Sequence, residues 1–274
     1  MTFRIAQISD SHLSETRPLF VENFVRIGEA LRASRPDLVL NTGDVSLDGV
    51  AQEGDLGAAR LLHDALGLPL RFLPGNHDLG DAQDAPGHGE STIDAERRAR
   101  YVRHFGPDWW WFDIPGWRIL GLNAQLLGSD LAAAADQERA IGEAMAGLGL
   151  RSLALCLHKP LFDQSPEDGE VTGRFLTPAA RRQLLDRLGL EPTLVISGHV
   201  HQFRVTTPGT SCHVWAPSTA FVLPDRIQPL YGLKRVGYVE HSLEADGTHR
   251  SAMIEVAGAP TQDVTDFPRL YGPG

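Results

Sequence analysis

The chain has 274 residues and a formal net charge of −10 at pH 7, with 42% hydrophobic and 22% charged residues. This composition is ordinary for a folded globular protein, and the length is within the range of a single α/β domain. The acidic balance argues against a nucleic-acid polymer or an anionic membrane as a partner, because both require a basic surface. No apolar run approaches the length of a membrane-spanning helix.

The first third of the chain alternates between predicted strands and predicted helices. Short apolar runs predict the strands, and apolar stripes with helical spacing predict the helices between them. In chain order these are a strand over residues 3–8, a helix over 20–31, a strand over 38–40, a helix over 51–66 and a strand over 70–73. This β-α-β-α-β order is the signature of a parallel sheet with helices packed against its faces. The strand over 3–8 occupies the start of the chain, so we expect no signal peptide ahead of it.

The remaining segments predict further helices and strands, separated by Gly- and Pro-containing turns. Helices are expected over 93–105, 132–148 and 177–188, and strands over 109–114, 117–122, 153–157 and 193–197. Four later β-type runs, over 203–207, 212–216, 236–242 and 251–256, predict a mostly antiparallel sheet. We predict one domain over residues 1–257, followed by an irregular tail over residues 258–274.

One loop and a run of aromatic residues leave alternatives open. Residues 79–91 have no apolar periodicity and predict a long loop beside the third strand, where a lid or a specificity element would lie. Trp109, Trp110 and Trp111 could stack on an aromatic ligand. Alternation along a strand turns at least one of the three inward, so core packing is the expected role for most of them.

The chain contains two cysteines, Cys156 and Cys212. Cys156 lies in an apolar run, which predicts a small core residue. A disulfide stays open, but this low cysteine content favours a reduced, cytoplasmic protein.

Polar side chains follow five of the predicted strands at the point where each strand ends. After the third strand a Pro-Gly turn leads directly to Asn76, His77 and Asp78. Asn, Asp and Gly favour turns in any case, so this segment alone fits an ordinary loop equally well. The other strand ends carry donors of the same kind: Asp10 and His12, Asp44, His158, and His199 and His201.

These donors indicate a metal site. The carboxyl ends of parallel strands lie along one edge of a sheet, and residues two apart on an extended segment point the same way, so Asp10 and His12 can act together. Carboxylates and imidazoles without thiolates suit Zn, Mn, Fe or Ni rather than a structural thiolate zinc. Without Asp78 there are seven such donors, which are too many for one ion and enough for two ions about 3.5–4 Å apart that share one carboxylate. They are Asp10, His12, Asp44, His77, His158, His199 and His201.

Six histidines lie outside these strand ends, and we expect them to be ordinary surface or core residues. They are His63, His88, His104, His213, His241 and His249.

Five blocks of sequence together resemble the calcineurin-like metallophosphoesterase superfamily. In chain order they are Asp10-Ser11-His12, Gly43-Asp44, Gly75-Asn76-His77-Asp78, His158 and Gly198-His199-Val200-His201. The resemblance covers roughly residues 3–220 and implies a two-sheet α/β sandwich with a dinuclear metal centre at the strand ends. By this resemblance the first ion would take Asp10, His12, Asp44 and His201. The second ion would take Asp44, Asn76, His158 and His199.

The same resemblance implies the chemistry. The ions would be two divalent or trivalent transition-metal ions, with Mn, Fe or Zn as the candidates. In-line attack on phosphorus would come from a hydroxide that bridges them. His77 would face the phosphate rather than bind metal, and would donate a hydrogen bond or a proton. Asp78 would either orient His77 or cap the turn, and both roles stay open.

Details of the motifs separate branches of the superfamily. Protein Ser/Thr phosphatases carry an Asp-Arg-Gly element after the second block and Glu after Asn-His, whereas here Val45 follows Asp44 and Asp78 follows His77. The chain is more similar to bacterial class III cyclic-nucleotide phosphodiesterases and glycerophosphodiesterases, which Pro217-Ser218-Thr219 also fits. Those relatives often have Leu-Asp where this chain has Leu122-Asn123.

The expected function is therefore hydrolysis of a small phosphodiester. The alternatives are a phosphomonoesterase acting on a small phosphorylated metabolite and a non-catalytic scaffold of the same fold. The complete ligand set, with His77, argues against the scaffold. Arg174 could contact substrate, although a surface arginine is the simpler interpretation. The sequence does not set the oligomeric state, and a homo-oligomer stays open.

Overall fold

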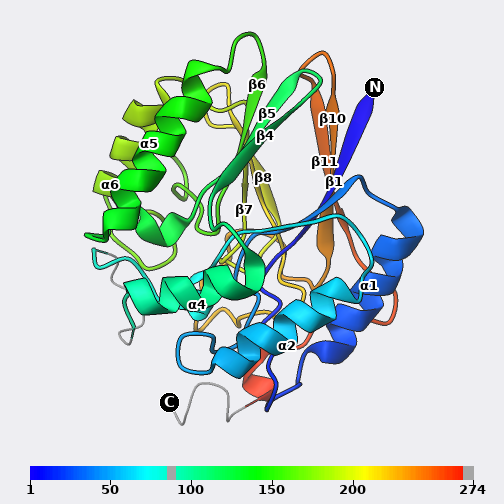
Figure 1. Cartoon of the computed structure of the whole chain (residues 1–274). Coiled ribbons are helices and arrows are strands. Elements are labelled where there is room, and N and C mark those ends of the chain that lie inside the picture. The colour runs from blue at the N-terminus through cyan, green and yellow to red at the C-terminus, as the bar shows by residue number, and fades with distance from the viewer. Residues whose placement is uncertain (85–90, 268–274) are drawn as a thin grey trace.

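The computed structural model describes residues 1–84 and 91–267, in which two β-sheets pack against each other with helices on their outer faces (Figure 1). This arrangement confirms the predicted two-sheet α/β sandwich. Residue His88 and the centre of the predicted 79–91 loop lie outside the described residues.

The strands and helices closely follow the predicted segments. The first sheet contains β1 (Thr2–Ile8), β2 (Leu38–Asn41), β3 (Leu70–Phe72), β10 (Tyr238–Glu244) and β11 (His249–Ile254). The second sheet contains β4 (Trp110–Ile114), β5 (Trp117–Gly121), β6 (Ser152–Cys156), β7 (Leu194–Ser197), β8 (Arg204–Thr206) and β9 (Cys212–Trp215). The α-helices are α1 (Val21–Ser34), α2 (Glu53–Asp64), α3 (Asn76–Leu79), α4 (Ala95–Phe105), α5 (Ala132–Ala146) and α6 (Pro178–Leu188), and the 3-10 helices are η1 (Ala124–Leu126) and η2 (Val264–Asp266).

The strand order is β11-β10-β1-β2-β3 in the first sheet and β4-β5-β6-β7-β9-β8 in the second. The strands β1, β2 and β3 are parallel, as predicted, and so are β5, β6, β7 and β9. The expectation that the last four strands form one mostly antiparallel sheet is wrong. They form two local antiparallel pairs, but β8 and β9 extend the second sheet while β10 and β11 extend the first. Turn residues specify the local pairs. Which sheet a pair joins depends on which sheet has an unpaired edge strand, and that strand is distant in the sequence.

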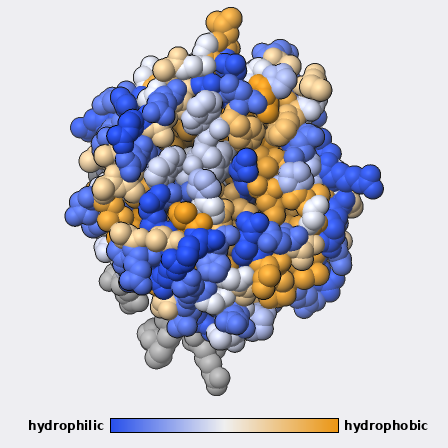
Figure 2. Space-filling model, viewed as in Figure 1, coloured by the Kyte–Doolittle hydropathy of each residue, from blue (hydrophilic) through white to orange (hydrophobic). Residues whose placement is uncertain are grey.

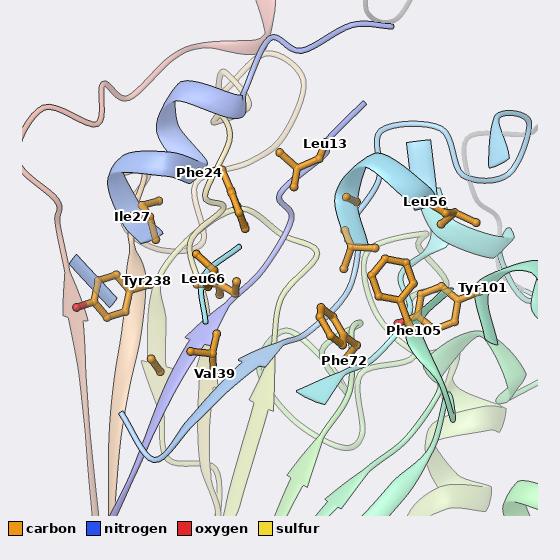
Figure 3. Close-up of a cluster of buried hydrophobic side chains, with 14 of the residues drawn as sticks. Leu13, Phe24, Ile27, Val39, Leu56, Leu66, Phe72, Tyr101, Phe105 and Tyr238 are labelled. Carbon is orange, nitrogen blue, oxygen red and sulfur yellow. The ribbon is translucent and has the colours of Figure 1, made fainter. Parts of the chain in front are cut away.

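Apolar side chains fill the space between the sheets and under the helices. Between the sheets, Ile5 and Leu40 of the first sheet share a buried cluster with Ile196 of the second. On the outer side of the first sheet, Phe24 and Ile27 of α1 are buried in one cluster with side chains of β2, β3 and α4 (Figure 3). Helices α5 and α6 cover the second sheet in the same way. Each fully buried Leu, Ile or Phe contributes roughly 1.5–3 kcal/mol, so these three layers hold the strand ends in place.

The tryptophan run has the packing role expected for most of it. Trp109 and Trp110 are partly buried against core clusters, and the indole N–H of Trp110 donates to the Phe72 carbonyl. Trp111 is 42% exposed and lies against the guanidinium of Arg118. Cys156 is buried, as predicted, and both cysteines are free.

The segment after residue 257 contacts the body of the protein. Val264 in η2 is buried with Phe20, Leu47 and Phe221, and the Val222 N–H donates to the Gln262 carbonyl. The division into a domain and a tail at residue 258 stays a prediction.

One face of the surface is shown in Figure 2, where hydrophilic residues predominate and apolar residues gather toward the middle. Within residues 1–84 and 91–267, no helix is both long enough and apolar enough to cross a membrane.

Candidate metal centre

The ends of five strands meet at one rim of the sandwich. β1, β2 and β3 belong to the first sheet and β6 and β7 to the second, so the rim spans two sheets rather than the edge of a single parallel sheet. Side-chain donor atoms there lie within 4.8 Å of one another in three groups: Asp10, His12 and His201; His12, Asp44 and His77; and Asp44, His158 and His199. With Asn76, these groups include all seven predicted ligands.

The backbone reaches this geometry through left-handed turns. Six non-glycine residues have positive φ in the described chain, and five of them are predicted ligands: Asp10, His12, Asp44, His199 and His201. Their φ angles of 44–68° cost on the order of 1–3 kcal/mol each in ordinary residues. The expectation that paired ligands lie on extended segments is therefore wrong, although the side chains still converge. Strain of this kind concentrates at functional sites.

The first group of ligands surrounds Asp10. The Nε2 atom of His201 lies 3.3 Å from Asp10 Oδ1 and 3.2 Å from the Nε2 atom of His12. Asp10 Oδ1 and His12 Nδ1 are buried without a hydrogen-bond partner in the part of the chain that the structure describes. Buried polar atoms almost always have partners, so an unsatisfied carboxylate oxygen facing two imidazole nitrogens suits a bound cation.

The second group surrounds His158. Its Nε2 atom lies 3.4 Å from Asp44 Oδ2, 3.3 Å from Asn76 Oδ1 and 3.1 Å from His199 Nδ1. The same Asp44 oxygen lies 3.9 Å from His12 Nε2 of the first group. Asp44 therefore lies between the two groups, where a carboxylate shared by two ions would have to be.

Backbone carbonyls orient three of the imidazoles. His158 and His201 donate their Nδ1–H to the carbonyls of Thr42 and Phe221, over 2.8 and 3.0 Å. His199 donates its Nε2–H to the Gly173 carbonyl over 2.9 Å. In the neutral ring, each bond leaves the other nitrogen without a proton and directed into the cluster, as a metal ligand requires. These carbonyls carry no signal in the sequence, because every residue has one.

The electrostatics of the site suit cations. Burial, together with the neighbouring imidazoles, holds the pKa of both His12 and His199 well below the usual value, so these rings are neutral. Burial raises the pKa of the Asp44 carboxyl, but the facing imidazoles of His158 and His77 outweigh it and hold that pKa well below its usual value. Burial lowers the pKa of His158, yet the Asp44 carboxylate overcomes this and raises it to about 9. The Asp44 carboxylate thus favours positive charge at the position of His158, as it would favour a bound cation.

Two glycines allow the ligand loops to approach closely. Gly43 has φ of +111°, and a Cβ added there would lie 2.5 Å from Nδ1 of His158. A Cβ on Gly75 would lie 2.1 Å from Asp44 Oδ1 and 2.4 Å from the Asp44 nitrogen. Gly43 and Gly75 are therefore required by the space around the ligands.

His77 and Asp78 lie on the short helix α3, not at a strand end as predicted. Rotation along this helix, rather than strand alternation, separates the side chains of Asn76 and His77. His77 Nδ1 lies 2.8 Å from the Leu47 carbonyl, and its ring stands perpendicular to that of His12 at 4.7 Å between centroids. Because a ring nitrogen of His77 also lies within 4.8 Å of donor atoms of His12 and Asp44, distance alone does not distinguish it from a ligand.

The contacts of Asp78 match the capping role left open by the sequence. Its carboxylate accepts hydrogen bonds from the N–H of Gly75 over 2.8 Å, and from the N–H and hydroxyl of Ser46 over 2.9 and 2.6 Å. Burial, followed by the Asp44 charge, raises the pKa of Asp78 to about 6. Asp78 thus joins the loop that carries Asp44 to the turn that carries Asn76.

The structure explains why position 123 is Asn rather than the Asp that is frequent in the similar phosphodiesterases. It is fully buried, and its Nδ2 donates to Asp108 over 2.8 Å. Arg98 binds the same carboxylate through two hydrogen bonds of 2.8 Å. An Asp at position 123 would face the Asp108 carboxylate, and the amide removes that repulsion.

Sequence reasoning missed an ion pair next to the ligands. Lys159 directly follows His158, is 2% exposed, and binds both oxygens of Asp81 over 2.6 and 2.7 Å. The feature of the sequence that could have indicated this ion pair is a lysine between the predicted ligand His158 and Pro160, directly after a buried strand. Arg174 donates to the Ile227 carbonyl over 3.2 Å, next to the Gly173 carbonyl that holds His199.

Residues 3–203 match the family described as calcineurin-like phosphoesterase, and the chain belongs to that family. Members of the family use dinuclear metal sites, which agrees with two ligand groups that lie on either side of Asp44.

Two curated proteins resemble the chain over most of its length. The 3',5'-cyclic adenosine monophosphate phosphodiesterase CpdA of Pseudomonas aeruginosa is 24% identical over 83% of both chains. A protein of Synechococcus sp. named "Probable cyclic nucleotide phosphodiesterase" is 26% identical over 92% of this chain and 91% of its own. A solved dimetal phosphatase from Danio rerio superimposes with a TM-score of 0.61 at 11% identity, covering 93% of this chain and 99% of that one, which shows the shared fold alone.

We predict that Asp44→Asn weakens metal binding at both positions, because Asp44 lies between the two groups. Asp10→Asn is the matched change in one group, and it should release one ion preferentially. Elemental analysis of the purified variants measures both outcomes. Two ions at wild-type occupancy in Asp44→Asn would contradict the shared role.

We also predict that Gly75→Ala loses metal while the secondary structure is retained, because the added methyl displaces the Asp44 loop. Gly169→Ala is the control, since a Cβ there meets no atom within 4 Å. Elemental analysis and circular dichroism separate the two effects. Wild-type metal content in Gly75→Ala would show that the Asp44 loop tolerates the shift.

Proposed function

We propose that the chain is a phosphodiesterase that hydrolyses small phosphodiesters of the cyclic-nucleotide or glycerophosphodiester class. The observation that carries this proposal is the pair of ligand groups on either side of Asp44, with the half-buried His77 beside them. The names of the two curated relatives support the diester class. The oligomeric state and a cytoplasmic location stay predictions.

The ligand side chains would leave part of the ions' positive charge uncompensated and available to a substrate. Asp10, His12, Asp44 and His201 would hold one ion, and Asp44, Asn76, His158 and His199 the other. Two bound transition-metal ions would supply Lewis-acid charge on the phosphoryl oxygens and a water of lowered pKa. The seven ligands contribute only two formal negative charges, from Asp10 and Asp44. An anionic phosphate can therefore approach although the chain as a whole carries −10.

His77 is proposed to act on the reacting phosphoryl group. The Leu47 carbonyl accepts from Nδ1 over 2.8 Å and so directs Nε2 away from that loop. A protonated ring can donate from Nε2 to a phosphoryl or leaving-group oxygen, which contributes about 10²–10⁴ in rate. Asp78 is proposed to act as a positioning residue that holds the Asp44 and Asn76 segments together.

The substrate class is tested with the metal-loaded protein and three substrates: bis-p-nitrophenyl phosphate, p-nitrophenyl phosphate and 3',5'-cyclic AMP. We expect kcat/KM to be highest for a diester. Faster cleavage of the monoester would favour the phosphomonoesterase. A metal-loaded protein that cleaves none of the three would favour the non-catalytic scaffold.

We predict that His77→Ala lowers kcat by about two to four orders of magnitude and leaves both ions bound, because the lost interaction is made mainly in the transition state. The loss should shrink for p-nitrophenolate leaving groups, which need no protonation. His104→Ala is the control, since His104 lies on α4, contacts Glu53 and belongs to none of the ligand groups. Loss of an ion from His77→Ala, or full activity on a poor leaving group, would contradict this role.

A further inference from the structure

We propose that Gln7 is a positioning residue for His158 and His199 of the metal centre, acting through Thr42 and Ser197 and oriented by His241. The inference rests on the dinuclear centre of the proposed function, and it is independent of which ester the chain cleaves.

Gln7 is an amide in an otherwise apolar layer. It lies on β1 and shares a strand face with Ile5, which belongs to the cluster between the sheets. His241 lies on β10 between Val239 and Leu243, which face the same layer. Both polar side chains are fully buried. Burying an amide costs roughly 1–3 kcal/mol unless its hydrogen bonds are made, so their partners matter.

The amide of Gln7 joins the two sheets. Its Nε2 donates to the Thr42 hydroxyl over 3.0 Å and to the Ser197 carbonyl over 2.9 Å, which uses both of its N–H groups. Thr42 follows β2 of the first sheet, and Ser197 ends β7 of the second. The side chain therefore fixes the separation of two strand ends that belong to different sheets.

His241 determines which way the amide points. Its Nε2 lies 3.1 Å from Gln7 Oε1, and its Nδ1 lies 2.8 Å from the Ser251 hydroxyl. Burial lowers the pKa of His241 to about 3, so the ring is neutral and carries one N–H. The Ser197 carbonyl can only accept, so the amide oxygen of Gln7 faces His241, and the ring N–H is therefore on Nε2 and donates to that oxygen. Nδ1 is left to accept from the Ser251 hydroxyl. The amide nitrogen is then left for Thr42 and Ser197.

Both partners of the amide lead directly to ligands of the same group. The Thr42 carbonyl accepts from His158 Nδ1–H over 2.8 Å. Ser197 precedes Gly198 and His199, and the Gly198 N–H donates to the His158 carbonyl over 2.9 Å. In the other group, His201 is held by the Phe221 carbonyl instead.

Gln7→Leu keeps the size of the side chain and removes these hydrogen bonds. Partners that orient metal ligands typically contribute 10–100-fold to metal affinity. We expect this loss for one of two ions, with the affinity for the other within twofold of wild type.

The experiment is a calorimetric titration of Zn²⁺ into the chelator-treated 274-residue protein, without substrate. Gln137→Leu is the matched control, because Gln137 is also an almost fully buried amide, and its hydrogen bonds go to the backbone of Asn123 rather than toward a ligand. Its melting temperature should fall as in Gln7→Leu, while both Zn²⁺ affinities stay within twofold of wild type.

A second pair of variants tests the same hydrogen bond if Gln7→Leu does not fold. Thr42→Val keeps the branched shape and removes the hydroxyl that accepts from Gln7, so one Zn²⁺ affinity should fall. Thr42→Ser keeps the hydroxyl and should retain both affinities.

Three results would overturn the inference. Gln7→Leu or Thr42→Val with both affinities within twofold of wild type would leave Gln7 as a core residue only. An equal loss at both positions would remove its selectivity for one group. A wild-type chain that binds fewer than two Zn²⁺ ions would overturn the dinuclear centre itself. Absence of esterase turnover, in contrast, would contradict the proposed function and leave the titration result intact.

Discussion

The carboxylate of Asp44 lies buried between imidazoles that come from both sheets, and the geometry of the rim depends on this contact. It is 3.4 Å from His158 and 3.9 Å from His12, and those two histidines belong to different ligand groups. The contact requires a left-handed backbone at Asp44 and no Cβ at Gly75. The packed layers between and outside the sheets offset the strain of such turns.

Most of the ligands are neutral imidazoles, and this explains how an acidic protein could bind an anionic substrate. Burial keeps His12 and His199 uncharged, and backbone carbonyls direct ring nitrogens of His158, His199 and His201 into the centre. Only two of the ligands, Asp10 and Asp44, are carboxylates, so bound cations would leave the centre with a net positive charge. The surface charge of −10 is spread over the whole molecule and acts over distances at which salt screens it.

The sequence was sufficient to predict the strand ends and the residues that meet there, because apolar runs locate the strands and the donors follow them directly. It was not sufficient to assign β8–β11 to their sheets, since that choice depends on edges distant in the sequence. It also predicted a strand end where Asn76 and His77 begin helix α3. The partners of His158 and His201 are main-chain carbonyls, and His241 was expected to be an ordinary residue. Its contact with Gln7 arises only when β1 and β10 pair.

The most direct test of the central claim is anomalous X-ray diffraction from crystals of the metal-loaded protein, recorded at the absorption edge of the bound metal. The account predicts two peaks about 3.5–4 Å apart with the Asp44 carboxylate between them. One peak should lie beside Asp10 and His201, and the other beside His158 and His199. A single peak, or two peaks of which only one contacts Asp44, would contradict it.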